Sequence, residues 1–401
     1  MKKRIIYVQY TNPAGYPPLE HSSQILAEND WDVLFLGTGA LGADKLQFDE
    51  LPAIRVLRLP FRPPGVRQKL NYVFFNLWCL AWFVRWRPDC VYFSDLQSCP
   101  LGLVATLLGM RTVFHEHDVP GSDAAGAFGR GLRWSRRHFA RRAELCVVPN
   151  AKRGALLVQS TGVRREPVVV WNCPRLQETA PPRPDSGQGA LRLLYHGSIV
   201  PDRLPLTVID ALAAVQADIT LTVVGYETTG SRGYMDALRR RAGELGIGAR
   251  LNILGTLARR EELMSVCRRH DAGLALMPLE SEDPNLGSMA GASNKPYDYL
   301  ACGLALLVSE LPDWEEMFVR SGYGLSCNPA SSKSIAAALN ALAANPEMTR
   351  LMGERGRQRV IEEWNYDRQF RPVMVHLDGN GRSSPEVFTA AESGFAEKAV
   401  R

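Results

Sequence analysis

The sequence has no long uncharged apolar run, no closely paired cysteines and no strong excess of charge. Its most apolar stretch, 72–84, is shorter than the roughly 18 residues that a membrane-spanning helix requires. The eight cysteines are scattered and none forms a Cys-x-x-Cys motif, so neither a disulfide framework nor a zinc site is indicated. The net charge of +5 is small and mixed along the chain, which does not indicate a nucleic-acid-binding protein.

Length and composition predict a soluble globular protein with two domains. The 401 residues exceed the size of a usual single hydrophobic core, and 46% of them are hydrophobic while 22% are charged. The first ten residues are basic, but their apolar run is too short and interrupted for a signal peptide, so we expect a first strand there. Together with the scattered cysteines, this start predicts a cytoplasmic protein.

The first half of the chain alternates strand-like and helix-like segments. Short apolar runs predict strands at 4–9, 31–36, 54–59, 90–93, 112–115 and 145–148. The segments between them predict helices at 19–29, 68–85, 101–108 and 132–142. Alternation of this kind is typical of parallel βαβ units in a doubly wound α/β sheet.

A proline-rich break without periodicity separates this half from a second, similar half, and we place the linker at 176–190. Strands are then expected at 191–196, 220–224, 251–254, 273–277 and 304–308. The expected helices are 206–214, 234–245, 261–270, 294–303, 332–343 and 346–363. The sequence therefore predicts two Rossmann-like domains, 1–175 and 191–361, facing each other across a cleft, with a peripheral or disordered tail at 377–401.

One glycine pattern resembles a cofactor motif but lacks its context. Gly37-Thr-Gly-Ala-Leu-Gly42 follows a predicted strand and matches the dinucleotide pattern G-x-G-x-x-G. No acidic residue stands about 20 positions further on, and Pro52 cuts short the helix that the motif requires. We therefore expect no dinucleotide at this loop.

The motif His115-Glu-His-Asp118 ends a predicted strand. Alternate strand positions place His115 and His117 on one face, which allows a metal pair. No further cluster with ligand spacing supports a metal. The alternative is a strand end at the cleft, where a histidine orients a substrate hydroxyl, and we expect no metal.

The segment 293–309 predicts a helix that begins at a phosphate. Ser293 or Asn294 suits the cap, and Lys295 lies at the mouth of the helix. Free backbone amides, the positive end of the helix dipole and a cation meet there, as a phosphate requires. Asp298, one turn further, is placed to accept hydrogen bonds from sugar hydroxyls. Taken alone, an ordinary capped helix is an equally good interpretation.

A second cationic loop follows the first strand of the second half. The segment His196-Gly-Ser-Ile-Val-Pro-Asp-Arg203 lies between a predicted strand and a predicted helix, so its amides and Arg203 face the same strand-end crevice. Each cation alone is typical of a protein surface. Arg203 and Lys295 together, from two separate loops, suit a diphosphate.

The helix expected at 68–85 is rich in aromatic residues and has basic residues at both ends. A helix of this kind suits peripheral contact with a membrane surface through 68–87. The alternative, a helix packed on a sheet, is favoured because a strand follows directly.

In order and spacing, the motifs resemble those of the retaining GT-B glycosyltransferases of the family 4 type, the glycosyl transferases group 1. The resemblance spans nearly the whole chain. The segments that carry it are the glycine loop 12–18, the strand 112–115, the strand and asparagine 168–172, the phosphate loop 194–203, the strand ends 222–225 and 253–256, and the helix 294–303.

The resemblance implies a UDP- or GDP-linked sugar donor and catalysis by His115, Arg203 and Lys295, with no metal and no cofactor. In such enzymes the histidine orients the acceptor, the acid at position 298 binds the ribose, and residues 362–376 cross back to the first domain. The implied donor-binding residues are Gly15, Gly197, Ser198, Gly225, Gly255, Thr256, Leu257, Ser293, Asn294 and Asp298.

Two positions depart from the family pattern. Ala290 stands where the first of two glutamates is common, and Glu280, Glu282 and Asp283 are candidates to replace it. Ser198 stands where many members carry an arginine. The contacts of the donor sugar are therefore the part of the site that the resemblance defines least.

The implied reaction is transfer with retention to a hydroxyl of a saccharide or lipid-linked acceptor, in cell-surface glycan or glycoconjugate synthesis. It would take place in the cytoplasm or at the inner face of the membrane. Two alternatives stay open: another GT-B enzyme such as a nucleotide-sugar epimerase, and a non-catalytic sugar- or membrane-binding module. No nucleic acid is expected as a partner.

Overall fold

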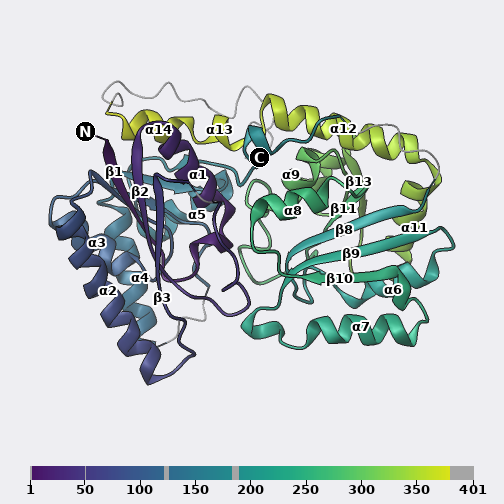
Figure 1. The fold of residues 1–401 in the computed structure, drawn as a ribbon, viewed down its shortest axis with the longest axis horizontal. Coiled ribbons are helices and arrows are strands. Elements are labelled where there is room, and N and C mark those ends of the chain that lie inside the picture. Colours follow the sequence, from purple (N-terminus) through teal and green to yellow (C-terminus); the bar gives the residue numbers. More distant parts are fainter. Residues whose placement is uncertain (1, 50, 122–125, 183–188, 380–401) are drawn as a thin grey trace.

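Two parallel sheets, each covered by helices, lie side by side along the long axis of the molecule (Figure 1). The computed structural model describes residues 2–49, 51–121, 126–182 and 189–379. The first sheet comes from the first half of the chain and the second from the second half. The predicted α/β fold with two Rossmann-like halves is confirmed.

The first sheet has seven parallel strands in the order β3-β2-β1-β4-β5-β6-β7. This order reverses beside β1, as in doubly wound sheets, so β1 lies near the centre between β2 and β4. The strands are β1 (Lys3–Val8), β2 (Trp31–Thr38), β3 (Ile54–Leu59), β4 (Cys90–Phe93), β5 (Thr112–His115), β6 (Leu145–Val148) and β7 (Val168–Val169).

Helices cover both faces of this sheet and bury two apolar layers. One layer includes side chains of α2 to α5, and the other includes α1 and two helices from the end of the chain. The helices of this half are η1 (Pro13–Gly15), α1 (Pro17–Glu28), α2 (Val66–Trp86), α3 (Cys99–Leu107), α4 (Gly126–Ala140) and α5 (Ala151–Thr161).

The second sheet has six parallel strands in the order β10-β9-β8-β11-β12-β13. Its order also reverses, between β8 and β11, which opens a crevice at the carboxyl ends of these two strands. The strands are β8 (Leu191–Ser198), β9 (Ile219–Tyr226), β10 (Leu251–Gly255), β11 (Ala272–Ala275), β12 (Ala305–Ser309) and β13 (Gly324–Cys327).

The second sheet also lies between two buried apolar layers. Side chains of α6, α7 and α11 fill one of them, and those of α8, α9, α10 and α12 fill the other. The helices and helical turns are η2 (Leu176–Glu178), α6 (Leu206–Ala214), η3 (Thr229–Ser231), α7 (Tyr234–Glu244), η4 (Gly248–Arg250), α8 (Arg260–Cys267), α9 (Asn294–Ala301), α10 (Pro312–Trp314), η5 (Glu315–Val319), α11 (Ser332–Ala344) and α12 (Pro346–Glu362).

The last two described helices, α13 (Tyr366–Gln369) and α14 (Arg371–Leu377), lie on the first half (Figure 1). Their buried apolar side chains join a core layer of the first sheet, and those side chains are Tyr366, Phe370, Val373 and Leu377. The chain therefore crosses between the halves twice, once through the segment after β7 and once after α12. Of the tail predicted at 377–401, Leu377 belongs to α14, and residues 380–401 lie outside the described residues.

The segment between the halves is packed along its first part. The guanidinium of Arg175 donates to Glu28 of α1 and to Asp367 of α13. The amide of Ala180 donates to the carbonyl of Ala301 at 2.8 Å. These contacts connect the linker to both halves, whereas residues 183–188 lie outside the described part of the chain.

Several elements differ from the expected ones. Helix α5 was not expected, because Gly154 and two basic residues obscure its periodicity, although Asn150 caps it by accepting from the amide of Arg153. Strand β13 was also not expected, since its short sequence Gly-Leu-Ser-Cys carries a weak apolar signal. Strand β2 extends to Thr38, so Gly37 of the apparent cofactor motif lies inside a strand.

Candidate active site

The carboxyl ends of the two sheets face each other and are joined by hydrogen bonds. After β5, the amide of Val119 donates to Oδ1 of Asn285 at 2.7 Å, and Nδ2 of Asn285 donates back to the Val119 carbonyl at 2.9 Å. After β6, Nδ2 of Asn150 donates to the carbonyls of Ser288 and Ala290. Parallel sheets bind ligands at this end, so we searched for the site there.

The two predicted phosphate cations come together at the end of β8. Lys295 lies in the first turn of α9, and a Cβ placed on Gly197 would lie 3.3 Å from its Nζ. Nη1 of Arg203 donates to Oγ of Ser198 at 3.0 Å, so this serine orients the arginine. Gly225 lies beside them on β9, where a Cβ would overlap the carbonyl oxygen of Gly197. Only glycine fits at this position.

Lys295 is buried and has no direct ion-pair partner among the described residues, although the negative charge of Asp298 lies near it. Its residue is 6% exposed, and no described residue forms a hydrogen bond or an ion pair with its Nζ. The ammonium lies 5.5 Å from the centre of the Tyr195 ring. Burial, reinforced by the positive charge of Arg203, lowers the pKa of Lys295 to about 7. An anion bound beside it would restore its charge, so the site is suited to phosphate.

Asp298 lies one turn further along α9, but Arg260 already binds it. Nη2 of Arg260 donates to Oδ1 of Asp298 at 2.6 Å, and Nη1 donates to Oδ2 at 3.2 Å. The same guanidinium pairs with Glu178 of the linker, whose carboxylate also lies 3.0 Å from Nε2 of His21 on α1. Asp298 is 1% exposed and thus fixes α9 within a buried charge network; its predicted contact with ribose stays a prediction.

Sequence reasoning missed Arg260 because its partners are distant in the chain, 38 residues away for Asp298 and 82 for Glu178. Its position at the first residue of α8 is typical of a solvent-exposed basic residue. No signal in the local sequence indicates that both carboxylates approach it. In a buried site such a guanidinium between two carboxylates is favourable, because each charge is paired and hydrogen-bonded.

The rings of His115, the last residue of β5, and His117 lie against each other at a tilt, with centroids 3.8 Å apart, so they share one face as the alternation predicts. His115 is fully buried, and its Nδ1 lies 2.8 Å from the hydroxyl of Tyr92. His117 lies outside it, against the ring of Tyr16 in the loop after β1. Burial lowers the pKa of His115 well below its ordinary value and that of His117 to about 4, so both rings are neutral near pH 7.

The glycine loop after β1 reaches the second half. A Cβ on Gly15 would lie 3.9 Å from the hydroxyl of Tyr226, the last residue of β9. On the next strand outward, Oγ1 of Thr256 donates to the carbonyl of Gly225. The predicted residues lie in the loop after β1, at or after the carboxyl ends of β8, β9 and β10, and at the start of α9. These are Gly15, Gly197, Ser198, Arg203, Gly225, Gly255, Thr256, Leu257, Ser293, Asn294 and Lys295.

Comparison with known families identifies the family of the chain. Residues 19–173 match the glycosyl transferase 4-like domain, and residues 177–359 match the glycosyl transferases group 1 domain. The two matches are consecutive and together include both sheets. The chain belongs to the glycosyl transferases group 1. This glycosyltransferase transfers a sugar from a nucleotide sugar.

Solved structures with the same GT-B arrangement of two sheets support the fold. Sucrose-phosphate synthase from Thermosynechococcus elongatus is 16% identical, with a TM-score of 0.70 over 95% of this chain and 100% of its own. Anabaena HepE in complex with UDP-glucose is 14% identical, with a TM-score of 0.70 over 94% and 99%.

WaaG, a glycosyltransferase involved in lipopolysaccharide biosynthesis, is 14% identical, with a TM-score of 0.63 over 94% of this chain and 100% of its own. At these identities the likeness establishes the fold alone. No curated protein sequence matches the chain.

Arg153 of α5 connects the histidine segment at the end of β5 with the loop between β11 and α9. The residue is 3% exposed and donates to the carbonyl of His117, to Oδ1 of Asp118 at 3.1 Å and to the carbonyl of Asn285 at 3.1 Å. Asn285 lies in the loop between β11 and α9. A single buried guanidinium therefore fixes the histidine segment and this loop relative to each other.

The apparent dinucleotide motif has a different role in the glycosyltransferase. Gly42 approaches the second half so closely that a Cβ would overlap the carbonyl oxygen of Glu227. Nearby, the amide of Gln47 donates to the carbonyl of Ala258 at 2.8 Å. The loop after β2 thus forms a contact between the halves.

The residues around the histidines also bear on metal binding. Glu116, between the two histidines, forms a buried ion pair with Arg136 of α4. Among the described residues, no group of three or more His, Cys, Asp and Glu side chains is placed to hold a metal ion.

No helix in the described ranges is both long and apolar enough to span a membrane.

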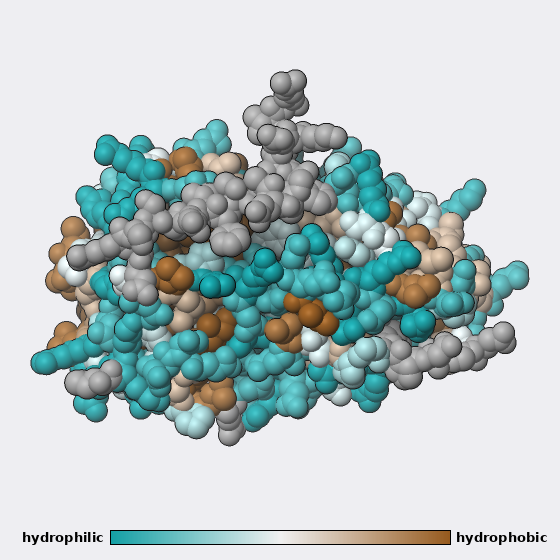
Figure 2. All heavy atoms as spheres, turned by 90° about the horizontal axis from the view of Figure 1, so that it is seen from above, coloured by the Kyte–Doolittle hydropathy of each residue, from teal (hydrophilic) through white to brown (hydrophobic). Residues whose placement is uncertain are grey.

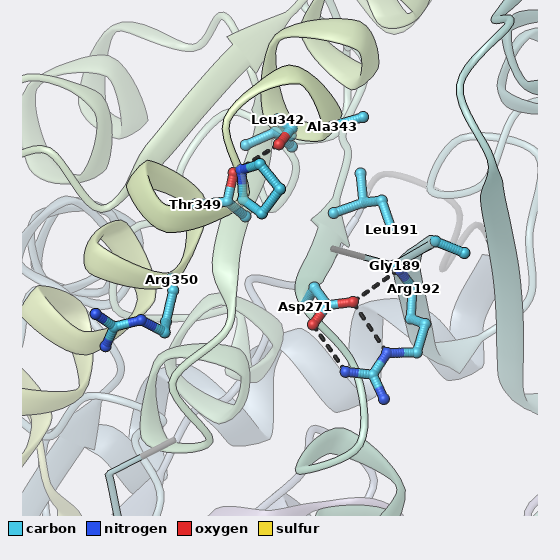
Figure 3. Close-up of a pocket in the computed structure, with 10 residues that line it drawn as sticks. Gly189, Leu191, Arg192, Asp271, Leu342, Ala343, Thr349 and Arg350 are labelled. Atoms are coloured by element: carbon cyan, nitrogen blue, oxygen red, sulfur yellow. Dashed lines mark hydrogen bonds and ion pairs between the residues drawn. The ribbon is translucent and has the colours of Figure 1, made fainter. Parts of the chain in front are cut away.

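The cavity shown in Figure 3 lies at the opposite edge of the second sheet, where β8 and β11 begin. Its volume is about 340 Å³, and Arg192 pairs with Asp271 at its wall (Nη2–Oδ1 2.9 Å). Because open parallel sheets bind ligands at the carboxyl ends of their strands, this cavity is not the active site. The remaining lining residues are Gly189, Ala190, Leu191, Leu342, Ala343, Pro346, Thr349 and Arg350.

Proposed function

We propose that this glycosyltransferase transfers a hexosyl group, with retention, from a UDP- or GDP-sugar to a hydroxyl of a saccharide or lipid-linked acceptor in cell-surface glycan or glycoconjugate synthesis. The observation that carries the proposal is the pairing of Lys295, a buried cation without a direct ion-pair partner among the described residues, with Arg203 at the end of β8. A UDP-sugar is further supported by Anabaena HepE, which was solved with UDP-glucose.

The donor half supports stabilisation of the leaving group without a metal. When the glycosidic bond to the nucleotide breaks, negative charge develops on the β-phosphate. We assign the stabilisation of this charge to Lys295 and Arg203, together with the free amides at the start of α9. Fixed cations in a buried site lower the barrier because they need no reorganisation as the charge develops. The methyl side chain of Ala290 cannot bind the donor sugar. Backbone groups of its loop, or the side chains of Glu280, Glu282 or Asp283, would bind the sugar instead.

The acceptor half supports orientation of a neutral hydroxyl. His115 is held by Tyr92, and it positions His117, whose ring nitrogens have no partner among the described residues. A neutral imidazole is able to accept a hydrogen bond from the acceptor hydroxyl. The hydroxyl then attacks from the face that the nucleotide leaves, and its proton passes to the departing phosphate. We assign acceptor orientation to His115, acting together with His117.

A thermal-shift screen with UDP, GDP, ADP and dTDP tests the donor base, since a ligand that binds only the folded state raises its melting temperature. We expect UDP or GDP to give the largest shift and Lys295→Ala to remove it. The anomeric configuration of the product, measured by NMR with the matching sugar nucleotide, tests retention.

The two alternatives give different results. An epimerase would release free nucleotide without any acceptor, and a non-catalytic module would keep its function in Arg203→Ala and Lys295→Ala variants. Either outcome would overturn the proposed transfer.

A further inference from the structure

Helix α2 carries two apolar stripes on opposite sides, and only one of them is used by the fold. Phe75, Cys79 and Phe83 face the first sheet and are buried. The other stripe recurs at spacings of three and four residues, as one side of a helix requires. It consists of Val66, Leu70, Val73, Phe74, Leu77 and Val84, which are 55% to 76% exposed.

Exposed apolar side chains are concentrated on the layer formed by α2, α3 and α4. Most of the exposed large apolar residues in the described ranges lie there. Besides the stripe on α2, they are Val104, Leu107 and Leu108 at the end of α3, and Phe128 and Trp134 on α4. Tyr72 of α2 contacts Phe128 edge-on at 5.4 Å, so the apolar surfaces of α2 and α4 are continuous. By contrast, the face in Figure 2 is mostly hydrophilic, with apolar residues in small separate groups.

The same layer carries positive charge and no negative charge. No aspartate or glutamate occurs in 51–88, in 96–115 or in 126–143. The exposed basic residues form no ion pair with any described residue, and they are Arg62, Arg67, Lys69, Arg85, Arg87, Arg130, Arg137, Arg141 and Arg142. The chain as a whole is nearly balanced, with 47 basic and 42 acidic residues, so this distribution is specific to the layer.

We propose that the α2–α3–α4 face, defined by these exposed apolar and basic residues, binds the surface of an anionic lipid bilayer. An apolar stripe flanked by basic residues inserts its aliphatic and aromatic side chains at the acyl boundary while the cations meet lipid phosphates. The structure thereby shows that the two interpretations of 68–87 are compatible, because one stripe packs on the sheet and the other faces outward. This inference goes beyond the proposed function and does not depend on it.

Charge favours the bilayer over other occupants. In a symmetric dimer the same patch meets itself, which would bring the basic residues of α2 and α4 against each other. Nucleic acid would satisfy the charge but would leave Leu70, Leu77 and Val84 against a polar surface. A bilayer with anionic head groups satisfies both the apolar and the basic side chains.

Co-sedimentation of the whole protein with vesicles tests the inference. We expect binding to vesicles of phosphatidylcholine with phosphatidylglycerol, much weaker binding to phosphatidylcholine alone, and loss of binding at high salt. The double variant Leu70→Gln/Leu77→Gln should bind at least about tenfold more weakly. Its control, Met348→Gln/Val375→Gln, removes two other exposed apolar side chains, which are 41% and 43% exposed, from α12 and α14 and should bind as the wild type does.

A single dye label tests the orientation, since all eight native cysteines are buried. Ala81 lies exposed within the stripe of α2, so an environment-sensitive dye on Ala81→Cys should shift to the blue with anionic vesicles. The same dye on Met348→Cys should not shift.

Three results would overturn the inference. They are the absence of binding to anionic vesicles, equal binding by the Leu70→Gln/Leu77→Gln variant, and a stripe-dependent dimer in the absence of any vesicle binding. The last result would identify a second copy of the chain as the occupant.

Discussion

The two sheets have nearly the same architecture, yet their facing edges carry opposite kinds of chemistry. At the first sheet, burial keeps His115 and His117 neutral, and the pKa of Glu20 on α1 is raised to about 7 by burial. At the second sheet, Lys295 and Arg203 add positive charge. Under the proposed function, the residues of their loops make the first edge suited to a neutral hydroxyl and the second edge suited to a diphosphate.

The two edges also differ in the free energy that is required to bury their side chains. Burial of a cation without a direct ion-pair partner is unfavourable, and the lowered pKa of Lys295 reflects this. Neutral histidines carry no such charge penalty, although Nε2 of His115 and both ring nitrogens of His117 are buried without a hydrogen-bond partner among the described residues. The donor edge instead has much to gain from an anion, which predicts that nucleotide stabilises the second half more than any acceptor stabilises the first.

The largest effect on folding stability is expected from a change in the segment of the chain that crosses back to the first half. Phe370 of α13's C-terminal end is fully buried in a core layer of the first sheet, so Phe370→Ala should cost about 3–5 kcal/mol of folding stability in that half. Chemical denaturation followed by two probes, one in each half, measures this. Val375→Ala on α14 is the control, since Val375 is 43% exposed. An unchanged unfolding midpoint in Phe370→Ala would contradict the role of the second crossing.

The next effect separates the donor edge from the acceptor edge. Lys295→Ala and Arg203→Ala should each lower kcat/KM, with a loss of about 2–4 kcal/mol of transition-state stabilisation. Folding should stay nearly intact. Isothermal titration should show weaker UDP or GDP binding in both variants. Lys333→Ala removes an exposed lysine from α11 and serves as the control.

His115→Ala should lower activity without weakening nucleotide binding. An equal loss of activity and of nucleotide affinity would contradict the separation of the two edges.

A smaller effect tests the connection between the edges. Arg153→Lys keeps a charge but cannot donate in the same fork to His117, Asp118 and Asn285. We expect a loss of about 1.5–3 kcal/mol, seen in kcat rather than in nucleotide affinity, because the two edges lose their relative position. If nucleotide affinity falls and kcat does not, Arg153 serves only the loop between β11 and α9.

The pH dependence should be modest and specific to the donor edge. With the pKa of Lys295 at about 7 instead of its ordinary 10.5, the folded state binds fewer protons than the unfolded chain between these values. Stability of the ligand-free protein should therefore rise with pH across this window. Nucleotide affinity should fall as the pH rises above 7, by up to about tenfold per unit, because the diphosphate requires the charged amine. Lys295→Arg should show a flatter profile in calorimetry.

No effect is expected from removal of divalent metal ions. Under the proposed function, Lys295 and Arg203 stabilise the phosphates, so transfer should continue in EDTA at the untreated rate. Activity that is lost in EDTA and restored by manganese would instead favour a metal at His115 and His117. With a metal ion there, both edges would carry positive charge.

Much of the donor edge is visible in the sequence because its signals are local. Capping residues, Lys295 and the apolar strand after it lie within one short segment, and the loop up to Arg203 follows a strand directly. The contacts of Asp298 are different. Its ribose role comes from a resemblance, whereas the structure pairs it with Arg260, which lies on another helix.

The stripes of α2 show a second kind of limit. Both stripes are apolar, so periodicity alone does not say which side faces the sheet. Packing decides it, because the layer below accommodates Phe75, Cys79 and Phe83, whereas the side with Leu70 and Leu77 has no described element above it.

By itself, the sequence determined the two α/β halves and the break between them, and it predicts a phosphate site at the start of α9. These depend on periodicity, caps and helix dipoles, which act between residues close in the chain. Only the tertiary structure decided that Arg153 joins the two edges, that Arg260 binds Asp298, and that Lys295 is buried without a direct ion-pair partner among the described residues. Burial and long-range ion pairs depend on which distant segments meet, and no local pattern records that.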